Sequence, residues 1–333
     1  MRFARTTGQQ DMAEALRALL DSGGGPTVAR SWANGDPAPW RRIWERLGEM
    51  GLCGVAIPER HGGLELGAVE LVVCLEELGH AGLPGPCLES IAVVPALLAG
   101  TDSGQRWLPE LAAGRAVATA AFTEHGPRAL DADAADVVFR CDGENAELAG
   151  RTGAEPERSL DPARRLWALA GGTPVPGARV AAAFDAGVLG CAAQSLGVAR
   201  RLLDTSIRYA GERHQFGRPV GGFQAVKHHL ANVALQLEFA RPLVHGACLS
   251  LDSGAEHAAR DVSAAKLAAS EAAHFAARTA LQVHGAIGYA AENDLQLWLT
   301  KATALRSAWG TATWHRRRVA DALAAGCTAP IGS

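Results

Sequence analysis

Apolar residues recur at intervals of three or four through two long stretches in the C-terminal half of the chain. Intervals of this kind place the apolar side chains on one face of an α-helix. Many of these positions are alanine, which is small enough for neighbouring helices to approach closely. The pattern therefore predicts a bundle of long helices. Its members are Leu230, Val233, Leu237, Ala240 and Val244 in the first stretch, and Val262, Ala265, Ala269, Ala272, Ala276, Thr279 and Val283 in the second.

The N-terminal part of the chain carries shorter helical patterns separated by turn residues. Residues 11–20 repeat apolar side chains at helical spacing, and Gly23-Gly24-Gly25-Pro26 ends the pattern. Residues 64–79 are apolar at several helical offsets, which predicts a buried helix. We therefore predict an N-terminal helical domain over residues 1–115. Its other predicted helices cover residues 40–50, 90–99 and 107–113.

The composition changes at Gly114, where short β-like runs replace the helical patterns. Three such runs are separated by Gly, Pro, Asp and Asn, and they predict a small β-domain over residues 116–184. The runs cover residues 116–122, 137–139 and 180–184.

From Asp185 onward the pattern is helical again, and we assign residues 185–333 to a C-terminal four-helix bundle. The last predicted helix covers residues 294–325 with an interruption at Trp309-Gly310-Thr311. The predicted fold class is mainly α with a small central β-domain.

Charge and cysteine content exclude several classes of function. The 333 residues carry a net charge of -3, which offers no basic surface to nucleic acid or to an anionic membrane. No segment is apolar and long enough to predict membrane insertion. The seven cysteines are odd in number and lack C-x-x-C spacing, so we expect reduced thiols, a cytoplasmic location and no metal site. The adjacent His228 and His229 diverge by about 100° on a helix, which also argues against metal binding.

A polar turn between two helical patterns is the strongest candidate for a binding site. In residues 207–231, Arg213 offers a planar fork of donors, Gln215 donates and accepts, and Phe216 presents a flat apolar face. These groups suit a phosphate joined to an aromatic ring system. A solvated loop between two helices is the alternative interpretation.

The turn resembles a signature of the acyl-CoA dehydrogenase family of flavoproteins. The family's Arg-x-x-Phe-Gly-x-Pro loop, followed by Phe-Gln, is similar to Arg213-His-Gln-Phe-Gly-Arg-Pro219 with Phe223-Gln224. Its Gln-x-x-Gly-Gly-x-Gly element is similar to Gln282-Val-His-Gly-Ala-Ile-Gly288, and residues 51–63 resemble its Gly-x-x-Pro-Glu-x-x-Gly-Gly loop. The resemblance implies an FAD held across a subunit interface. The implied cofactor-binding residues are Arg213, Gln215, Phe216, Gln224, Gln282, Gly285 and Ala286, the last in place of a glycine.

The resemblance is incomplete at two places. These are the loop with which family members bind the flavin ring and the positions of their catalytic base. Residues 122–128 keep Thr-Glu but lose the family's Gly-Ser-Asp, and Trp167 is only a remote candidate for its Trp segment. The family's usual base position holds Trp309, and the alternative position in a second branch holds Gly187. We therefore identify no catalytic residue. The other acids, Glu124, Glu238, Glu271 and Glu292, are expected to have structural roles.

The pattern is similar to the shorter subunits of the heteromeric α2β2 acyl-CoA dehydrogenases of actinobacteria, which act on steroid side-chain CoA thioesters. The resemblance implies an acyl-CoA substrate and a second acyl-CoA dehydrogenase subunit that carries the base. Two alternatives remain open. One is a self-sufficient homo-oligomer with an unusual base, and the other is a non-catalytic scaffold.

Overall fold

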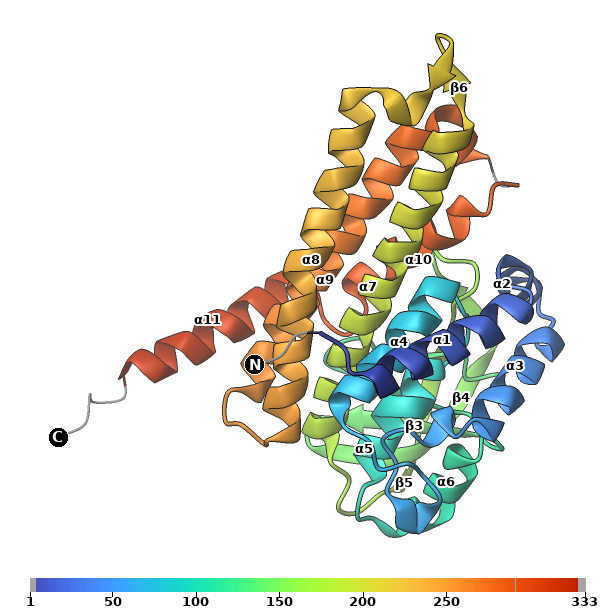
Figure 1. The fold of residues 1–333 in the computed structure, drawn as a ribbon. Coiled ribbons are helices and arrows are strands. Elements are labelled where there is room, and N and C mark those ends of the chain that lie inside the picture. Colours follow the sequence, from blue (N-terminus) through green and yellow to red (C-terminus); the bar gives the residue numbers. More distant parts are fainter. Residues whose placement is uncertain (1–3, 291, 329–333) are drawn as a thin grey trace.

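The computed structural model describes residues 4–290 and 292–328, with side chains to residue 325. Helices of the N-terminal part pack beside a tall bundle of long helices, and a small sheet lies at one end of the molecule (Figure 1). The N-terminal elements are α1 (Thr7–Ser22), α2 (Pro26–Ala33), α3 (Ala38–Glu49), η1 (Leu52–Gly54), η2 (Glu59–His61), α4 (Ala68–Ala81), the π-helix η3 (Glu89–Val93), α5 (Val94–Leu98) and α6 (Asp102–Ala112).

Local sequence explains where the first helices begin and what they bury. The Thr6 side chain and Gln9 form a capping box at the start of α1, and Pro26 occupies the first turn of α2, where its missing N–H costs nothing. Trp32, Trp40 and Trp44 are at most 1% exposed and pack ring against ring in the core of this part. The cysteines 53, 74, 87, 141, 191 and 248 are buried free thiols, and Cys327 lies outside the described side chains.

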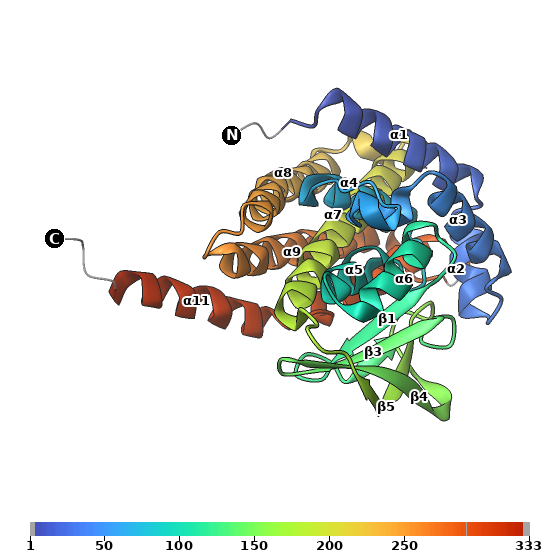
Figure 2. The same cartoon turned by 90° about the horizontal axis from the view of Figure 1, so that it is seen from below.

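The sheet has five strands in the order β1-β3-β4-β5-β2, with β1 and β3 parallel and the other pairs antiparallel. It lies on the side of α5 and α6 that faces away from α1 (Figure 2). The predicted runs at residues 116–122 and 137–139 are confirmed as β1 and β3. The strands are β1 (Ala118–Phe122), β2 (Arg128–Leu130), β3 (Val137–Asp142), β4 (Asn145–Arg158) and β5 (Arg165–Pro174).

The β-like run at residues 180–184 is a wrong prediction, because it forms the first turns of helix α7 (Val180–Glu212). Three of its five residues are alanine, the strongest helix former, and only Val180 is β-branched. These residues pack as the start of a long central helix, and this packing outweighs their weak strand pattern.

The predicted fold class is confirmed, and the C-terminal part is built from long helices that bury the predicted faces. Val233, Leu237 and Ala240 are buried along α8, and Val262 and Ala265 along α9. The predicted interruption near Trp309 separates α10 from α11, which projects away from the rest of the molecule (Figures 1 and 2). These helices are α8 (Gln224–Asp252), α9 (Ala258–His284), α10 (Leu295–Ser307) and α11 (Ala312–Thr328).

Helix α7 is the central helix of the molecule. It is long and apolar enough to pass a test for a membrane span, but 78% of its most apolar window is buried inside the protein. Helix α4 crosses it at two glycines. A Cβ at Gly79 would lie 2.3 Å from the carbonyl oxygen of Gln194, and one at Gly197 would lie 2.0 Å from that of Glu76. The two helices can therefore cross this closely only because both positions are glycine.

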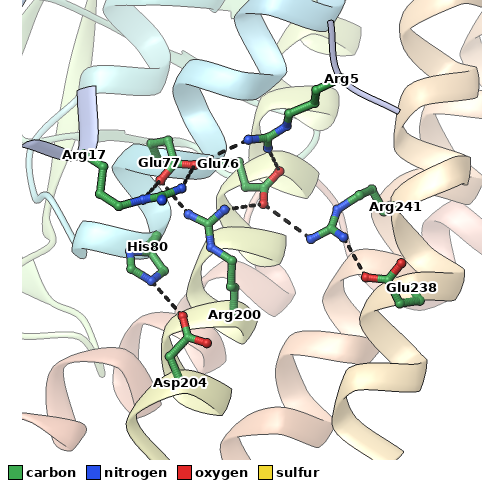
Figure 3. Close-up of polar contacts among 9 residues, drawn as sticks. All are labelled: Arg5, Arg17, Glu76, Glu77, His80, Arg200, Asp204, Glu238 and Arg241. Atoms are coloured by element: carbon green, nitrogen blue, oxygen red, sulfur yellow. Dashed lines mark hydrogen bonds and ion pairs between the residues drawn. The ribbon is translucent and has the colours of Figure 1, made fainter. Parts of the chain in front are cut away.

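A buried ion network joins the N-terminal helices to the bundle (Figure 3). The adjacent Glu76 and Glu77 of α4 are at most 1% exposed. Arg200 of α7 donates to both, at 2.9 Å to Glu76 and 2.5 Å to Glu77. Arg5 donates to Glu76 at 2.7 Å, and Arg17 of α1 reaches both oxygens of Glu77 at 3.0 and 3.2 Å. Arg241 of α8 lies 3.7 Å from Glu76 and pairs with Glu238 at 2.7 Å.

Arginines determine the direction of the pKa shift of Glu77. Burial alone would raise the pKa of Glu77, but the hydrogen bonds from Arg17 and Arg200 outweigh it and hold the pKa below its usual range. A carboxyl with a lowered folded-state pKa stabilises the fold above its unfolded pKa of about 4.3. That stabilisation is lost as the pH falls through the lower folded value.

We predict that Glu77→Gln lowers the free energy of unfolding at pH 7 by about 1–3 kcal/mol, because it removes the counter-charge of the partly exposed Arg17 while Arg5 and Arg200 keep Glu76. Its loss of stability between about pH 5 and pH 3 should be shallower than that of the wild type. Urea denaturation across this pH range measures both effects. Glu110→Gln is the control, since it breaks only the exposed pair with Arg115 and should leave stability nearly unchanged. Equal stability of Glu77→Gln and wild type would contradict the prediction.

Candidate functional site: a hairpin at the end of the bundle

The predicted polar turn is a small hairpin between α7 and α8. Its strands are β6 (His214–Gln215) and β7 (Arg218–Pro219), with Gln215 opposite Arg218. Phe216 and Gly217 form the turn with φ of 52° and 76°, as a two-residue type I′ turn requires. Glycine adopts this conformation freely, whereas for Phe216 it costs about 1–2 kcal/mol. Phe216 is nonetheless 92% exposed, and its ring meets that of Phe223 only edge to face, with centroids 6.2 Å apart.

A stacked pair of rings brings the hairpin beside the second predicted element. Tyr209, one turn before Arg213 on α7, stacks on His284 at the end of α9 with ring centroids 4.3 Å apart. The Tyr209 hydroxyl also donates to the His284 carbonyl at 3.4 Å. Burial lowers the pKa of His284, so its ring is neutral at pH 7 and stacks without a charge. The contact joins the ends of α7 and α9, which are distant in sequence.

Four of the seven predicted cofactor-binding residues line one cavity of about 450 Å³. They are Arg213, Gln215, Phe216 and Gln282. Among the described residues, the Arg213 side chain has no hydrogen bond or ion pair, and it is exposed. The cavity thus combines a free guanidinium, two amides and several ring faces. The remaining lining residues are Tyr209, Val220, Phe223, Ala225, Val226, His229, Val283 and His284.

The other three predicted residues lie beside this cavity and do not line it. Gln224 begins α8 immediately after Phe223, and Gly285 and Ala286 follow His284 in the 3-10 helix η5 (Gly285–Tyr289). All three are exposed. Sequence reasoning missed Tyr209 and His229 as lining residues. Helical spacing could have identified them, since Tyr209 lies four residues before Arg213 and His229 three after Val226.

Trp309 and Gly187, which the resemblance predicts to stand at the family's two base positions, meet near the start of α7. The Trp309 ring lies directly on Gly187, where a Cβ would come within 2.3 Å of a ring carbon. Trp309 has a φ of 61°, so a strained backbone holds the ring there. Its ring also contacts Phe122, with centroids 5.3 Å apart. An indole therefore fills the space beside Gly187.

The altered Thr-Glu loop adds further rings at the same place. His125 stacks on Phe184 with centroids 4.0 Å apart and meets Trp314 edge to face at 4.5 Å. Trp167 is not part of this cluster. It is 5% exposed in a second small core within the sheet, and its Nε1 donates to Asp133 at 2.7 Å.

The four acids named from the sequence are exposed, and Glu124 lines a cavity together with His125 and Trp314 of this cluster. Glu238 pairs with Arg241, and Glu271 pairs with Arg316. Glu124 and Glu292 are exposed. Sequence reasoning did not single out Glu89, which is 4% exposed and lies with Trp309 along a cavity of about 420 Å³ between the sheet and α10.

Comparison with known proteins places this architecture in a family. A model of the acyl-CoA dehydrogenase N-terminal domain matches residues 6–115, and one of the C-terminal domain matches residues 177–324. Acyl-CoA dehydrogenase IpdE2 of Mycolicibacterium smegmatis is 33% identical over 298 residues, covering 87% of this chain and 90% of that protein.

Solved structures agree on the fold. The ChsE4–ChsE5 complex from Mycobacterium tuberculosis matches with a TM-score of 0.82 at 24% identity, over 97% of this chain and 99% of that chain. A variant of the Tcur3481–Tcur3483 steroid ACAD matches with a TM-score of 0.84 at 24% identity and the same coverage.

The fold and these matches define a flavoprotein oxidoreductase that acts on acyl-CoA. The chain belongs to the acyl-CoA dehydrogenase family, whose cofactor is FAD.

We predict that Gly187→Ala destabilises the chain by about 1–3 kcal/mol, because the new methyl group collides with the Trp309 ring. In a Trp309→Ala background the same change should be neutral or stabilising by up to about 1 kcal/mol, as alanine is in an uncrowded helix. The Gly211→Ala control also lies in α7 but meets nothing within 4 Å. Denaturation of the four members of this double-mutant cycle gives the coupling, and additive effects would show that the ring does not lie on Gly187.

Proposed function

We propose that this chain is one of two unlike subunits of an FAD-dependent acyl-CoA dehydrogenase. In this proposal it supplies the half-site for the pyrophosphate and adenosine of an FAD whose ring lies in the partner chain. The observation that carries the proposal is the convergence of Arg213, Gln215, Phe216 and Gln282 on one cavity.

The chemistry of the cavity fits that half of the cofactor. The Arg213 guanidinium suits a pyrophosphate, because its donors form charge-assisted hydrogen bonds to phosphate oxygens. The exposed ring of Phe216 offers an apolar face to a sugar or a base, and the half-buried Phe223 lies beneath the Arg218 guanidinium. The strained turn that exposes Phe216 is consistent with a binding role, since such strain gathers at ligand sites.

Helix α7 separates this cavity from the chain's own altered site, and the separation supports a partner. Gly187 lies near the start of α7 and Glu212 at its end, about 38 Å apart at the rise of an α-helix. The hairpin and the sheet accordingly lie at opposite ends of the molecule (Figure 1). One FAD does not reach between them, so the ring of an FAD held at the hairpin meets another chain.

The packing of Trp309 on Gly187 supports a base in the partner. Desaturation of an acyl-CoA requires a positioned carboxylate to take the α-proton. FAD, when bound, accepts the hydride from the β-carbon. In this chain Trp309 and Gly187 exclude a carboxylate from both family positions, so the partner supplies the proton acceptor.

We propose an α2β2 assembly in the cytoplasm that acts on a CoA thioester of a steroid side chain. Two structural neighbours support this choice, because one is described as a complex of two different chains and the other as a steroid ACAD. The described free thiols are consistent with a reducing compartment.

One observation favours a second candidate, a homo-oligomer that supplies its own base. Glu89 is a buried acid on the same cavity as Trp309. Flavin absorbance and turnover separate the candidates when measured for the chain purified alone and after co-expression with the acyl-CoA dehydrogenase encoded beside it. We expect flavin and activity only in the co-expressed complex. A yellow, fully active chain on its own would refute the proposal, and absence of flavin in both samples would favour a scaffold.

We predict that Arg213→Ala lowers the affinity of the complex for FAD roughly a hundredfold, the equivalent of about 2–3 kcal/mol for a charge-assisted contact to phosphate. Helicity should be unchanged, because the side chain makes no hydrogen bond or ion pair with the described residues. Arg208→Ala is the matched control, since it removes an exposed cation one turn earlier that does not line the cavity. Flavin retained per complex at dilute protein without added FAD gives the result. Equal retention by wild type and Arg213→Ala would exclude the hairpin as a cofactor site.

We predict that Glu124→Gln, Glu238→Gln, Glu271→Gln and Glu292→Gln each leave turnover of the complex within about tenfold. Removal of a general base typically costs 10²–10⁴-fold. Turnover is measured with FAD at saturation, so that cofactor loss does not contribute. A thousandfold loss in any one variant would show that this chain supplies the proton acceptor.

A further inference from the structure

A hollow of about 830 Å³ lies on the wall of the bundle, lined by side chains of α8, α9 and α10. It adjoins the hairpin cavity, because His229 and Gln282 line both. It is separate from the sheet, since none of its lining residues belongs to a strand. The hollow is thus the surface next to the proposed FAD half-site, and it extends from the hairpin along α9 to α10.

Two arginines without a partner determine the charge of this hollow. Arg278 of α9 and Arg306 of α10 both line it, and both are exposed. Among the described residues, neither guanidinium makes a hydrogen bond or an ion pair. The one acid in the described lining, Glu271, already pairs with Arg316. The hollow therefore presents two positive charges that no carboxylate of the described chain offsets.

The fields of the two arginines overlap at His274. This residue lies one turn before Arg278 on α9 and also lines the hollow. Burial lowers the pKa of His274, and the guanidinium groups of Arg306 and Arg278 lower it further. Its ring is therefore neutral at pH 7 and does not add to the charge. The two arginines thus act on one place and can meet one acidic surface together.

Exposed apolar side chains border the hollow. Phe275 lines it and is 38% exposed. Phe239 of α8 is 66% exposed and lies three residues after the lining residue Gln236, which places both on one face of the helix. Leu235 and Leu243, four residues to either side of Phe239, are half exposed. Aromatic rings together with arginines are characteristic of the centres of protein–protein interfaces.

The charge of the hollow argues against a second copy of this chain as its occupant. A two-fold contact between identical chains places the same patch on both sides. Centred on the hollow, such a contact would oppose Arg278 and Arg306 of one copy to the same arginines of the other, which is strongly unfavourable. A small inorganic anion would leave the apolar border exposed. A protein surface that presents carboxylates beside apolar side chains satisfies both features.

We propose that this face of the bundle docks the unlike subunit, which places carboxylate side chains against Arg278 and Arg306 and apolar side chains against the neighbouring rings. The inference rests on the proposed function, from which it takes the unlike subunit. It adds the face that holds this partner and the charge that selects it. The two lining residues shared with the hairpin cavity put the contact next to the FAD half-site.

Charge reversal in the complex co-expressed with the neighbouring acyl-CoA dehydrogenase tests the electrostatic part. Arg278→Glu and Arg306→Glu should each raise the dissociation constant of the two unlike chains roughly 10- to 100-fold, because each replaces an attraction by a repulsion. Added salt should weaken the wild-type complex more than the double variant Arg278→Gln/Arg306→Gln. Sedimentation velocity of a dilution series at saturating FAD gives these constants.

Arg42→Glu is the matched control for charge reversal. Arg42 is an exposed cation on α3 that lines neither the hollow nor the hairpin cavity. This variant should dissociate as the wild type does. Circular dichroism verifies that each variant is folded, which we expect because all three arginines are exposed.

Carbodiimide cross-linking of the complex identifies the occupant. The reagent joins a lysine amine to a carboxylate in contact with it, so Arg278→Lys and Arg306→Lys introduce the reactive group and keep the charge. We expect mass spectrometry to find each new lysine joined to an Asp or Glu of the unlike subunit. Arg42→Lys should give no link between chains.

Several outcomes would overturn the proposal. They are unchanged dissociation constants in both reversal variants, links only to a second copy of this chain, and no link from either new lysine. A complex that assembles and retains flavin in all of these variants would refute this docking surface and leave the FAD half-site intact. Failure of the two unlike wild-type chains to associate would refute the proposed function as well.

Discussion

Two adjacent buried carboxylates, Glu76 and Glu77, hold the parts of this molecule in register. Burying two like charges side by side is unfavourable unless cations with good geometry meet them. Arginines from the N-terminal segment, α1, α7 and α8 do so, and Arg200 spans both carboxylates with the two arms of its guanidinium (Figure 3). Each carboxylate is met by arginines from more than one segment. The network therefore ties the N-terminal helices to the bundle.

Helix α7 connects two chemically different sites in the molecule. At its start, aromatic side chains gather around Trp309, and Gly187 leaves room for the Trp309 ring. At its end, a hairpin presents a free guanidinium and an exposed ring. The length of one helix, about 38 Å from Gly187 to Glu212, separates the two places.

Features of this structure that depend on interactions between residues close in sequence were predictable, and features that depend on contacts between distant segments were not. The helical stretches were predictable because apolar periodicity is a local property of the backbone, and the faces with Val233, Leu237 and Val262 are buried as expected. The run at residues 180–184 was misjudged because a five-residue window does not contain the helix to which it belongs. Glu89 was overlooked for a related reason, since an acid in a short apolar run reveals neither its burial nor the cation beside it.

The sequence by itself determined most of the helices, the small β-domain and the polar residues of the hairpin, and it predicted that Trp309 and Gly187 stand where the family resemblance places a base. These are properties of single residues or of spacings within one element. The tertiary structure alone decided that Trp309 lies on Gly187, that Tyr209 stacks on His284 and that Arg164 lies beside Glu89. Contacts of this kind join segments far apart in the chain. Their charges and pKa values depend on burial and on neighbours that only the folded chain brings together.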